Sequence, residues 1–130
     1  MSVVRLKRVY EPAARGDGLR VLVDRLWPRG LKREATKIDH WLKEVAPTEQ
    51  LRRWFNHDPK RWAEFQKRYH AELVTNKEHA ATLRALTAGR KPVTLLFAAK
   101  DIERNNAVVL RDWLSRSALH RPRRRALVEK

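Results

Sequence analysis

Two continuous apolar runs of strand length constrain the fold of this chain more than any other feature of its sequence. The run "VTLLFAA" spans residues 93–99, and the run "LRVLVD", residues 19–24, contains three consecutive apolar residues at 21–23. A strand with one face in water alternates apolar and polar residues, whereas a continuous apolar run is typical of a strand covered on both faces. We therefore predict two buried strands that lie inside a sheet.

A further strand is predicted near the start of the chain. The stretch "VVRLKRVY", residues 3–10, carries apolar residues in a partly alternating pattern and is followed by Glu11 and Pro12. The segment "AARGDG" after it is a turn, in which Gly16 and Gly18 supply backbone freedom. Because this connection is short, both a hairpin and a parallel arrangement of the first two strands are compatible with the sequence.

Most of the remaining residues have the apolar periodicity of helices. The predicted helices, with their apolar residues, are 38–45 (Ile38, Trp41, Leu42, Val45), a helix capped by Thr48 (Leu51, Trp54, Phe55), one with Asp58 as N-cap and Pro59 at its first position (Trp62, Phe65, Tyr69, Leu73), one from Asn76 to Gly89 (Ala80, Leu83, Leu86), and a last helix capped by Asn105 or Asn106 (Ala107, Leu110, Trp113, Leu114). Strands separated by helices predict an α/β fold. We expect a small three-layer domain, with a mostly parallel short sheet of about three core strands flanked by helices.

Length and charge predict the domain organisation. A chain of 130 residues with 42% hydrophobic residues is the size of one domain, which we place at residues 1–119. The last eleven residues, 120–130, contain five basic residues and one acid around Pro122, and we expect them to form a basic, flexible tail. The whole chain has 30 Lys plus Arg and 15 Asp plus Glu, a formal charge of +15. The electrostatic field of such a positive charge favours nucleic acid, anionic metabolites or acidic proteins as partners.

Several classes of function are excluded by what the sequence lacks. With no cysteine, the chain has no disulfide, thiolate nucleophile or cysteine-ligated metal. It has no G-x-G-x-x-G, P-loop lysine, G-x-S-x-G or H-E-x-x-H motif, so we expect neither a cofactor nor a metal site. It also has no apolar run of membrane-spanning length. Its first twenty residues include several charged ones, which does not fit a secretory signal. We expect a cytoplasmic protein without a membrane segment.

Charged residues follow the ends of the predicted strands. Asp24 and Arg25 come after the second strand, and Lys100 and Asp101 come after the strand at 93–99. In open α/β sheets, ligands bind beyond the carboxyl ends of the strands, and arginine side chains suit phosphate or carboxylate groups. The candidate ligand-binding residues, including an indole for stacking and a loop histidine, are Asp24, Arg25, Trp27, Arg29, His57, Lys100 and Asp101.

A purely structural role for these residues is also open. Asp24 and Arg25 would then form a buried ion pair, Trp27 would fill core, and His57 would merely precede the helix cap at Asp58. The residues do not decide whether the site catalyses a reaction. If it does, Asp24, Asp101 and His57 are the candidate proton-transfer groups.

Three stretches together resemble a known family. They are "VLVDRLWPRGLK", "IDHWLKEVAPTEQLRRWFNHDPKRWAEFQKRY" and "VTLLFAAKDIERNNAVVLRDWL", within about residues 3–115. In this order they resemble the YeaO-like bacterial proteins of domain-of-unknown-function family 488. The resemblance implies no established activity. Longer relatives often carry a cysteine-containing segment after the last core strand, whereas "AAKDIERNN" here has no cysteine, so a thiol-based function does not carry over.

The preferred hypothesis is that the protein binds an anionic small molecule, bearing a phosphate or carboxylate, at the carboxyl ends of its strands. The alternative is a nucleic-acid-binding module whose affinity falls steeply with salt. It would use the tail residues Arg121, Arg123, Arg124 and Arg125 and the helix residues Arg52, Arg53, Lys60, Arg61, Lys67 and Arg68. A scaffold for an acidic protein partner is a third possibility. The sequence leaves the oligomeric state open.

Overall fold

The computed structural model describes residues 2–116, whose strands form one sheet in the order β1-β4-β2-β3. The strands are β1 (Val4–Arg8), β2 (Leu19–Leu22), β3 (His40–Trp41) and β4 (Val93–Phe97). The helices and 3-10 turns are η1 (Arg15–Asp17), α1 (Arg33–Thr36), η2 (Lys43–Val45), α2 (Glu49–Phe55), η3 (Pro59–Arg61), α3 (Trp62–Thr75) and α4 (Lys77–Leu86), followed by a helix over residues 106–116. None of these helices is long and apolar enough to cross a membrane.

The strand β4 lies in the middle of the sheet and is buried along its whole length. It pairs in parallel with β1 on one side, where Val4 faces Val93, and with β2 on the other, where Leu19 faces Val93. The continuous apolar run that predicted this buried strand is therefore explained by neighbours on both edges and cover on both faces. The hairpin alternative is wrong, because β1 and β2 each pair with β4 and run parallel to it.

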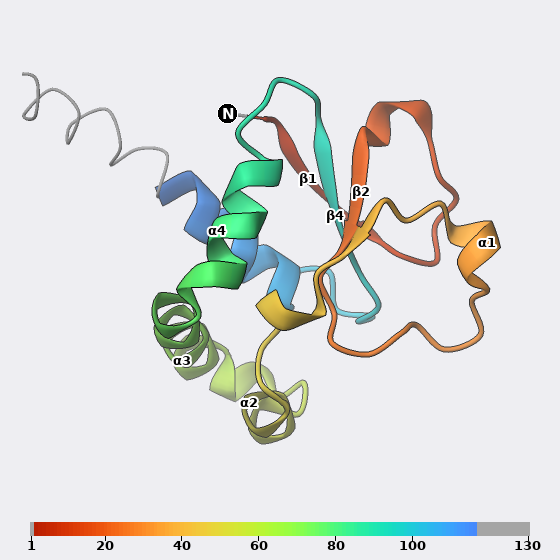
Figure 1. Ribbon diagram of the computed structural model, residues 1–130. Helices are drawn as coiled ribbons and strands as arrows, with labels where there is room; N and C mark the ends of the chain where they lie inside the picture. Colours follow the sequence, from red (N-terminus) through yellow and green to blue (C-terminus); the bar gives the residue numbers. More distant parts are fainter. Residues whose placement is uncertain (1, 117–130) are drawn as a thin grey trace, which may run out of the picture.

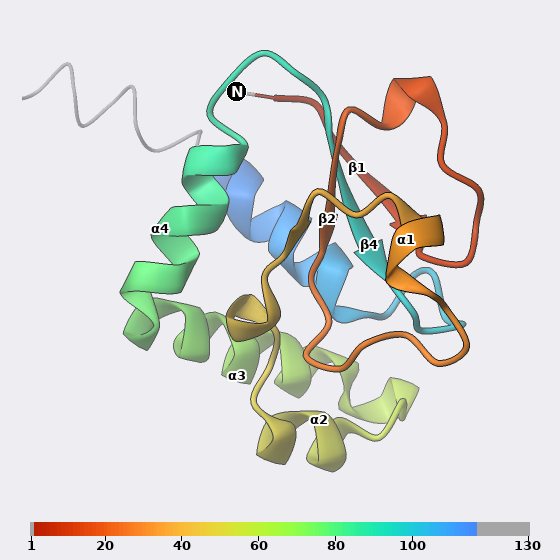
Figure 2. The ribbon, with the colours of Figure 1, turned by 45° about the vertical axis from the view of Figure 1, so that its right-hand side comes forward.

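Helices cover one face of the sheet, and a shorter layer covers the other. Figures 1 and 2 show α3, α4 and the helix over 106–116 on one side of the sheet and α1 on the opposite side. On the helical side, Val21 and Leu95 belong to a large cluster with Phe65 and Leu110. On the other side, Leu22 and Leu96 form a smaller cluster with residues of the segment that contains α1. The predicted small three-layer α/β fold is thus confirmed.

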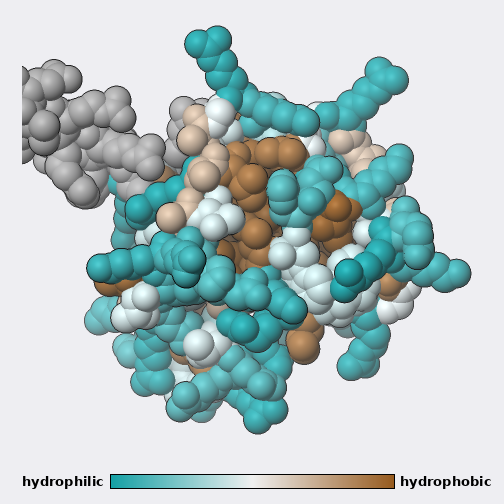
Figure 3. All heavy atoms as spheres, viewed as in Figure 1, coloured by the Kyte–Doolittle hydropathy of each residue, from teal (hydrophilic) through white to brown (hydrophobic). Residues whose placement is uncertain are grey.

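Hydrophilic residues gather on the outside of this fold. On the face seen in Figure 3, they form most of the outer rim, while apolar residues are visible in the middle between α4 and β2. This face is therefore mostly hydrophilic, in keeping with the many charged residues of the sequence, although apolar residues are also exposed on it.

The predicted helix caps are confirmed where a side chain accepts the expected hydrogen bond. Thr48 Oγ1 accepts from Leu51 N at 3.2 Å, and Asp58 Oδ1 accepts from Lys60 N at 3.0 Å. Asn105, rather than Asn106, caps the last helix, because its Oδ1 accepts from the amide of residue 108 at 3.1 Å. The helix expected to end at Gly89 ends at Leu86 instead.

The helix predicted over residues 38–45 is wrong. The chain forms the short edge strand β3 and the turn η2 there, because the amides of Asp39 and Leu42 donate to the backbone of β2, each at 2.9 Å. A helix would place Ile38, Trp41, Leu42 and Val45 on one face. In the structure, Ile38 and Trp41 pack on the α1 side of the sheet, whereas Leu42 and Val45 pack on the helical side.

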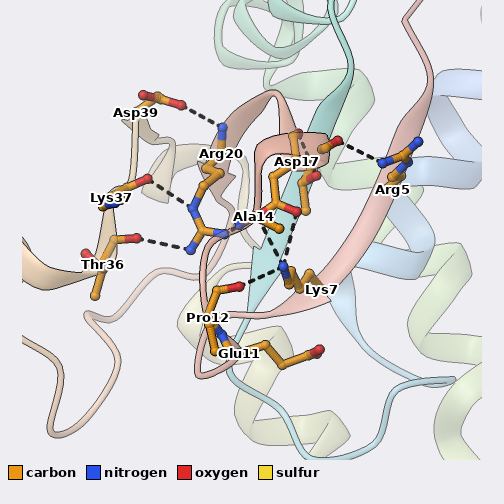
Figure 4. Close-up of polar contacts among 12 residues, drawn as sticks. Arg5, Lys7, Glu11, Pro12, Ala14, Asp17, Arg20, Thr36, Lys37 and Asp39 are labelled. Atoms are coloured by element: carbon orange, nitrogen blue, oxygen red, sulfur yellow. Dashed lines mark hydrogen bonds and ion pairs between the residues drawn. The ribbon is translucent and has the colours of Figure 1, made fainter.

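A buried ionic network closes the end of the sheet where the strands begin, on the α1 side (Figure 4). Asp17 accepts from Arg20 Nη1 at 2.6 Å and from Lys7 Nζ at 3.1 Å, and its side chain is 9% exposed. Arg20 also donates to the carbonyls of Thr36 and Lys37, each at 3.0 Å, and thereby holds the end of α1. Burial raises the pKa of Asp17, but hydrogen bonds from the Ala14 amide and the two cations lower it more, so the pKa lies below 3.8.

Gly18 is required by the close approach of two chain segments. Its φ is +64°, and a Cβ at this position would lie 2.0 Å from the carbonyl oxygen of Pro92. This approach allows Leu19 N to donate to the same oxygen at 2.9 Å, which starts the pairing of β2 with β4. Only glycine satisfies both the backbone conformation and the contact.

We expect Asp17→Asn to destabilise the protein by about 3–5 kcal/mol at neutral pH, because the buried Arg20 and the partly buried Lys7 lose their anion. The folded-state pKa of Asp17 is depressed, so its stabilisation is present above pH 3.8 and is lost as the pH falls through the folded pKa. Urea unfolding at neutral pH and below pH 4 should show the gap between wild type and variant narrowing in acid. The exposed Glu78→Gln is the control, and a gap that stays constant with pH would contradict this role.

For Gly18→Ala we expect a loss of at least about 2 kcal/mol in the free energy of unfolding, from left-handed strain plus the overlap with Pro92. Gly89→Ala is the matched control, since a Cβ there meets nothing within 4 Å, and its effect should stay within about 0.5 kcal/mol. Both values come from urea denaturation. Equal effects of the two substitutions would show that the approach to Pro92 does not constrain the fold.

Candidate functional site

A cleft with a volume of about 620 Å³ lies beyond the carboxyl ends of β2 and β4. All seven residues predicted from the sequence line it: Asp24, Arg25, Trp27, Arg29, His57, Lys100 and Asp101. They come from three segments, namely the loop after β2, the loop after β4 and the turn between α2 and η3. The parallel pairing of β2 with β4 brings the first two segments together, as the sequence analysis expected.

Asp24 lines this cleft and joins three elements. Its Oδ2 accepts from Ala98 N, just after β4, at 2.8 Å, and its Oδ1 accepts from Asn106 Nδ2 at 3.2 Å. Asn106 Nδ2 also donates to the carbonyl of Val23 at 2.7 Å, which fixes the amide as a donor. Asp24 therefore ties the end of β2 to the end of β4 and to the first turn of the last helix.

Burial and hydrogen bonding act in opposite directions on the Asp24 carboxyl. Burial raises the pKa of Asp24, and the hydrogen bonds from Ala98 and Asn106, together with the charge of Arg52, offset only part of that rise. The pKa thus lies above its ordinary value.

Arg25 is held by backbone carbonyls and not by Asp24. Its Nε donates to Pro47 O at 3.1 Å and its Nη2 to Ala46 O at 3.2 Å. Within residues 2–116, Asp24 and Arg25 form no ion pair with each other, so that part of the structural alternative is wrong. Arg25 fixes the segment between η2 and α2 while its side chain lines the cleft.

Trp27 has a packing role in addition to its place at the cleft. Its Nε1 donates to Leu31 O at 2.7 Å, and its ring meets Trp41 edge to face with centroids 5.4 Å apart. The guanidinium of Arg33 lies over both rings, 4.9 Å from Trp27 and 5.2 Å from Trp41. The expectation that Trp27 fills core is therefore correct for this side of the sheet, and the indole also borders the cleft.

Arg29 and Lys100 are exposed at the rim of the cleft. Tyr10 Oη donates to the carbonyl of Arg29 at 3.1 Å, which holds the loop after β2 by its backbone. In the part of the chain that the structure describes, neither cation lies within 4 Å of a carboxylate. Both charges are thus available to a ligand.

Asp101 folds back onto its own loop. Its Oδ1 accepts from Glu103 N at 2.9 Å and from Arg104 N at 3.1 Å, and Oδ2 lies 3.4 Å from Arg104 Nε. The hydrogen bond from the Glu103 amide, followed by that from the Arg104 amide and the charges of Arg104 and His57, holds the pKa of Asp101 below its ordinary value. Asp101 thereby positions Arg104 at the cleft.

His57 reaches the cleft through a turn with unusual backbone conformation. Asn56 and His57 have φ of +46° and +54°, a left-handed geometry that costs free energy for residues other than glycine. The turn is closed by Asp58 N, which donates to Phe55 O at 2.9 Å. The imidazole is exposed at the rim, with its ring centroid 6.4 Å from that of Phe55.

The sequence analysis did not assign Arg52, Arg104 and the apolar residues of the cleft to the site. Arg52 was placed on a basic helix face, although it lines the same cleft as His57, five residues later in the chain. The spacing of Arg104 three residues after Asp101 was the available signal for its placement. Phe55 and Phe65 were interpreted as core, which is correct, but they also line the cleft.

The basic residues of the nucleic-acid hypothesis have a different setting. Arg121, Arg123, Arg124 and Arg125 lie outside the described residues. On α2 and α3, surface ion pairs join Arg53 to Glu49 at 2.8 Å and Arg68 to Glu64 at 3.0 Å. These pairs reduce the positive field of the two helices. Nucleic-acid binding stays a prediction.

Metal binding was not expected from the sequence. Among residues 2–116, no group of three or more His, Asp or Glu side chains is placed to hold a metal ion. The chemistry that the described residues offer at this cleft is therefore that of cations, two carboxyls and one imidazole.

The two acids of the cleft should titrate on opposite sides of their ordinary value. We expect the Asp24 carboxyl to titrate above 3.8, because it is buried, and that of Asp101 below 3.8, because backbone amides donate to it. A carboxyl ¹³C NMR titration measures both pKa values. Asn106→Ala should raise the pKa of Asp24 further, since it removes a donor, and the reverse order of the two acids would contradict the described geometry.

Known proteins resemble the chain over most of its length. A family model described as "Inactive DUF488-N3 subclade" matches residues 3–127. "Uncharacterized protein YeaO" of Escherichia coli (strain K12) is 44% identical over 111 residues, which cover 85% of this chain and 96% of YeaO. "Uncharacterized protein Rv3073c" of Mycobacterium tuberculosis (strain ATCC 25618 / H37Rv) is 44% identical over 112 residues, 86% of this chain and 93% of the relative. No solved structure gives a significant match. The chain therefore belongs to the DUF488 family of YeaO-like proteins, in the subclade described as inactive DUF488-N3.

Proposed function

We propose that this chain binds an anionic small molecule, bearing a phosphate or carboxylate, in the cleft beyond the ends of β2 and β4. The observation that carries the proposal is the charge of the cleft lining. Five cationic residues line the cleft against two acids: the cations are Arg25, Arg29, Arg52, Lys100 and Arg104, and the acids are Asp24 and Asp101. This positive charge would attract an anion, and Arg29 and Lys100 at the rim would donate charge-assisted hydrogen bonds to it.

The two acids do not cancel this preference, because the protein's own donors already occupy them. Asp101 Oδ1 accepts from two backbone amides, and Asp24 accepts from Ala98 N and Asn106 Nδ2. Arg29 and Lys100, in contrast, have no carboxylate partner within the described residues and keep their donors free. The cleft is thus arranged to receive acceptors rather than donors.

Binding without turnover fits the remaining observations. The family model that matches the chain carries the word inactive in its description, and the loop "AAKDIERNN" beside the cleft has no cysteine to act as a nucleophile. His57 is exposed at the rim, and the candidate proton-transfer acids serve the loop structure. We therefore favour a binding protein over an enzyme.

The test compares methyl phosphate binding to wild type and to the double variant Arg29→Gln/Lys100→Gln. We expect the variant to lose roughly tenfold in affinity, because two free cations leave the rim. The amide shifts of Ala98 and Asn106 in NMR titrations report binding at the cleft. The ionic strength is held constant, since surface charges are screened by salt.

The double variant Arg15→Gln/Lys67→Gln is the matched control. It removes the same two charges from exposed positions that do not line the cleft, so it lowers the long-range field equally. Its affinity for methyl phosphate should fall by less than about twofold. Equal losses in the two double variants would mean that only the net charge of the protein attracts the anion, and the proposal would be withdrawn.

A further inference from the structure

We infer that the anion bound in this cleft carries an aromatic ring, which sits on the apolar base while the charged group stays at the cationic rim. This inference rests on the proposed function and names the class of ligand for the same site. A free aromatic phosphate or carboxylate, including a nucleotide, has this chemistry.

The cleft lining changes in polarity with depth. The buried residues that line it are largely apolar and include Ala46, Pro47, Phe55 and Phe65. The exposed residues that line it include the cations Arg29 and Lys100. A ligand that matches this gradient has an apolar body below and a charged group above.

The volume of the cleft exceeds what a small inorganic anion requires. At about 620 Å³ it falls within the range of ordinary small-molecule sites. Phosphate or acetate at the rim would leave the apolar base in contact with water, which is unfavourable. A ligand that carries a ring removes this contact.

Aromatic residues line the base of the cleft, which favours an aromatic ligand. Phe55 and Phe65 stack with centroids 4.3 Å apart and an interplanar angle of 21°, and Trp62 supports them at centroid distances of 5.8 and 5.7 Å. These buried rings are fixed by their neighbours in the core and lose little freedom on binding. Trp27 and Tyr10 add aromatic surface at the sides, and aromatic pairs gain more than their buried area alone provides.

Leu26 extends this apolar surface to the mouth of the cleft. It lines the cleft and is 63% exposed, so its side chain lies at the surface and not in the core. A ring on the base would bring an edge toward Leu26. The side chain therefore offers a way to weaken ring binding without disturbing the core.

The test compares phenyl phosphate with methyl phosphate, which share the charged group and differ in the ring. We expect phenyl phosphate to bind at least about tenfold more tightly, as measured from the amide shifts of Ala98 and Asn106 in NMR titrations. Butyl phosphate tests whether an aliphatic body suffices, and phenol tests whether the ring binds without the charge.

Each outcome has a separate meaning. Equal affinities of phenyl and methyl phosphate would overturn the inference and leave the proposed function intact, whereas no binding of either would overturn both. Butyl phosphate as tight as phenyl phosphate would overturn the aromatic preference. Phenol as tight as phenyl phosphate would contradict the proposed anion site itself.

A pair of variants assigns the ring to the cleft. Leu26→Ser should lower the advantage of phenyl over methyl phosphate about threefold or more and leave methyl phosphate binding unchanged. Val74→Ser is the matched control, because Val74 is 64% exposed on α3 and does not line the cleft, and it should change neither affinity. An unchanged advantage in Leu26→Ser would place the ring elsewhere and overturn the inference.

Discussion

The parallel pairing of β4 with a strand on each side is the constraint on which the rest of the structure depends. Because β1, β2 and β4 all run in the same direction, the loops that leave β2 and β4 emerge at the same edge of the sheet. The cleft forms between these two loops, and Asp24 joins them by accepting hydrogen bonds from Ala98 and Asn106. Any other strand direction would separate the residues that line the cleft. The position of the site is therefore a consequence of topology before it is a matter of individual side chains.

Those features of the fold that depend on local pattern were predictable from the sequence. The buried strand β4 and the caps at Thr48 and Asp58 follow from residues close together in the chain. The segment from Ile38 to Val45 was not predictable in this way, because its spacing fits a helix as well as a strand followed by a turn. Its conformation is decided by the free edge of β2, which accepts from the amides of Asp39 and Leu42. That edge becomes visible only when the sheet is assembled.

The same division applies to the site. The acid and base after each strand were found from the sequence, because parallel strands must deliver them to one edge. The hydrogen-bond partners of those charges were not found from the sequence. Asp24 and Arg25 are neighbours in the chain, yet Asp24 accepts from Ala98 and Asn106, whereas Arg25 donates to backbone carbonyls. The apolar base of the cleft was not recognised for a physical reason, since Phe55 both packs in the core and lines the cleft. A pattern of apolar residues does not distinguish these two uses.

The charged residues at the two ends of the sheet differ in burial and pairing. This difference distinguishes charges that stabilise the fold from charges that are candidates for ligand binding. Near the beginning of β2, Asp17 and Arg20 are buried together and nearly every donor and acceptor has a partner, as a structural ion pair requires. At the other end, Arg29 and Lys100 are exposed at the rim of an apolar cleft, and the described part of the chain supplies no carboxylate within 4 Å of them. Exposed cations without a carboxylate partner add little to stability, so folding does not account for their placement. The proposed anionic ligand would neutralise these charges and cover the apolar surface beneath them.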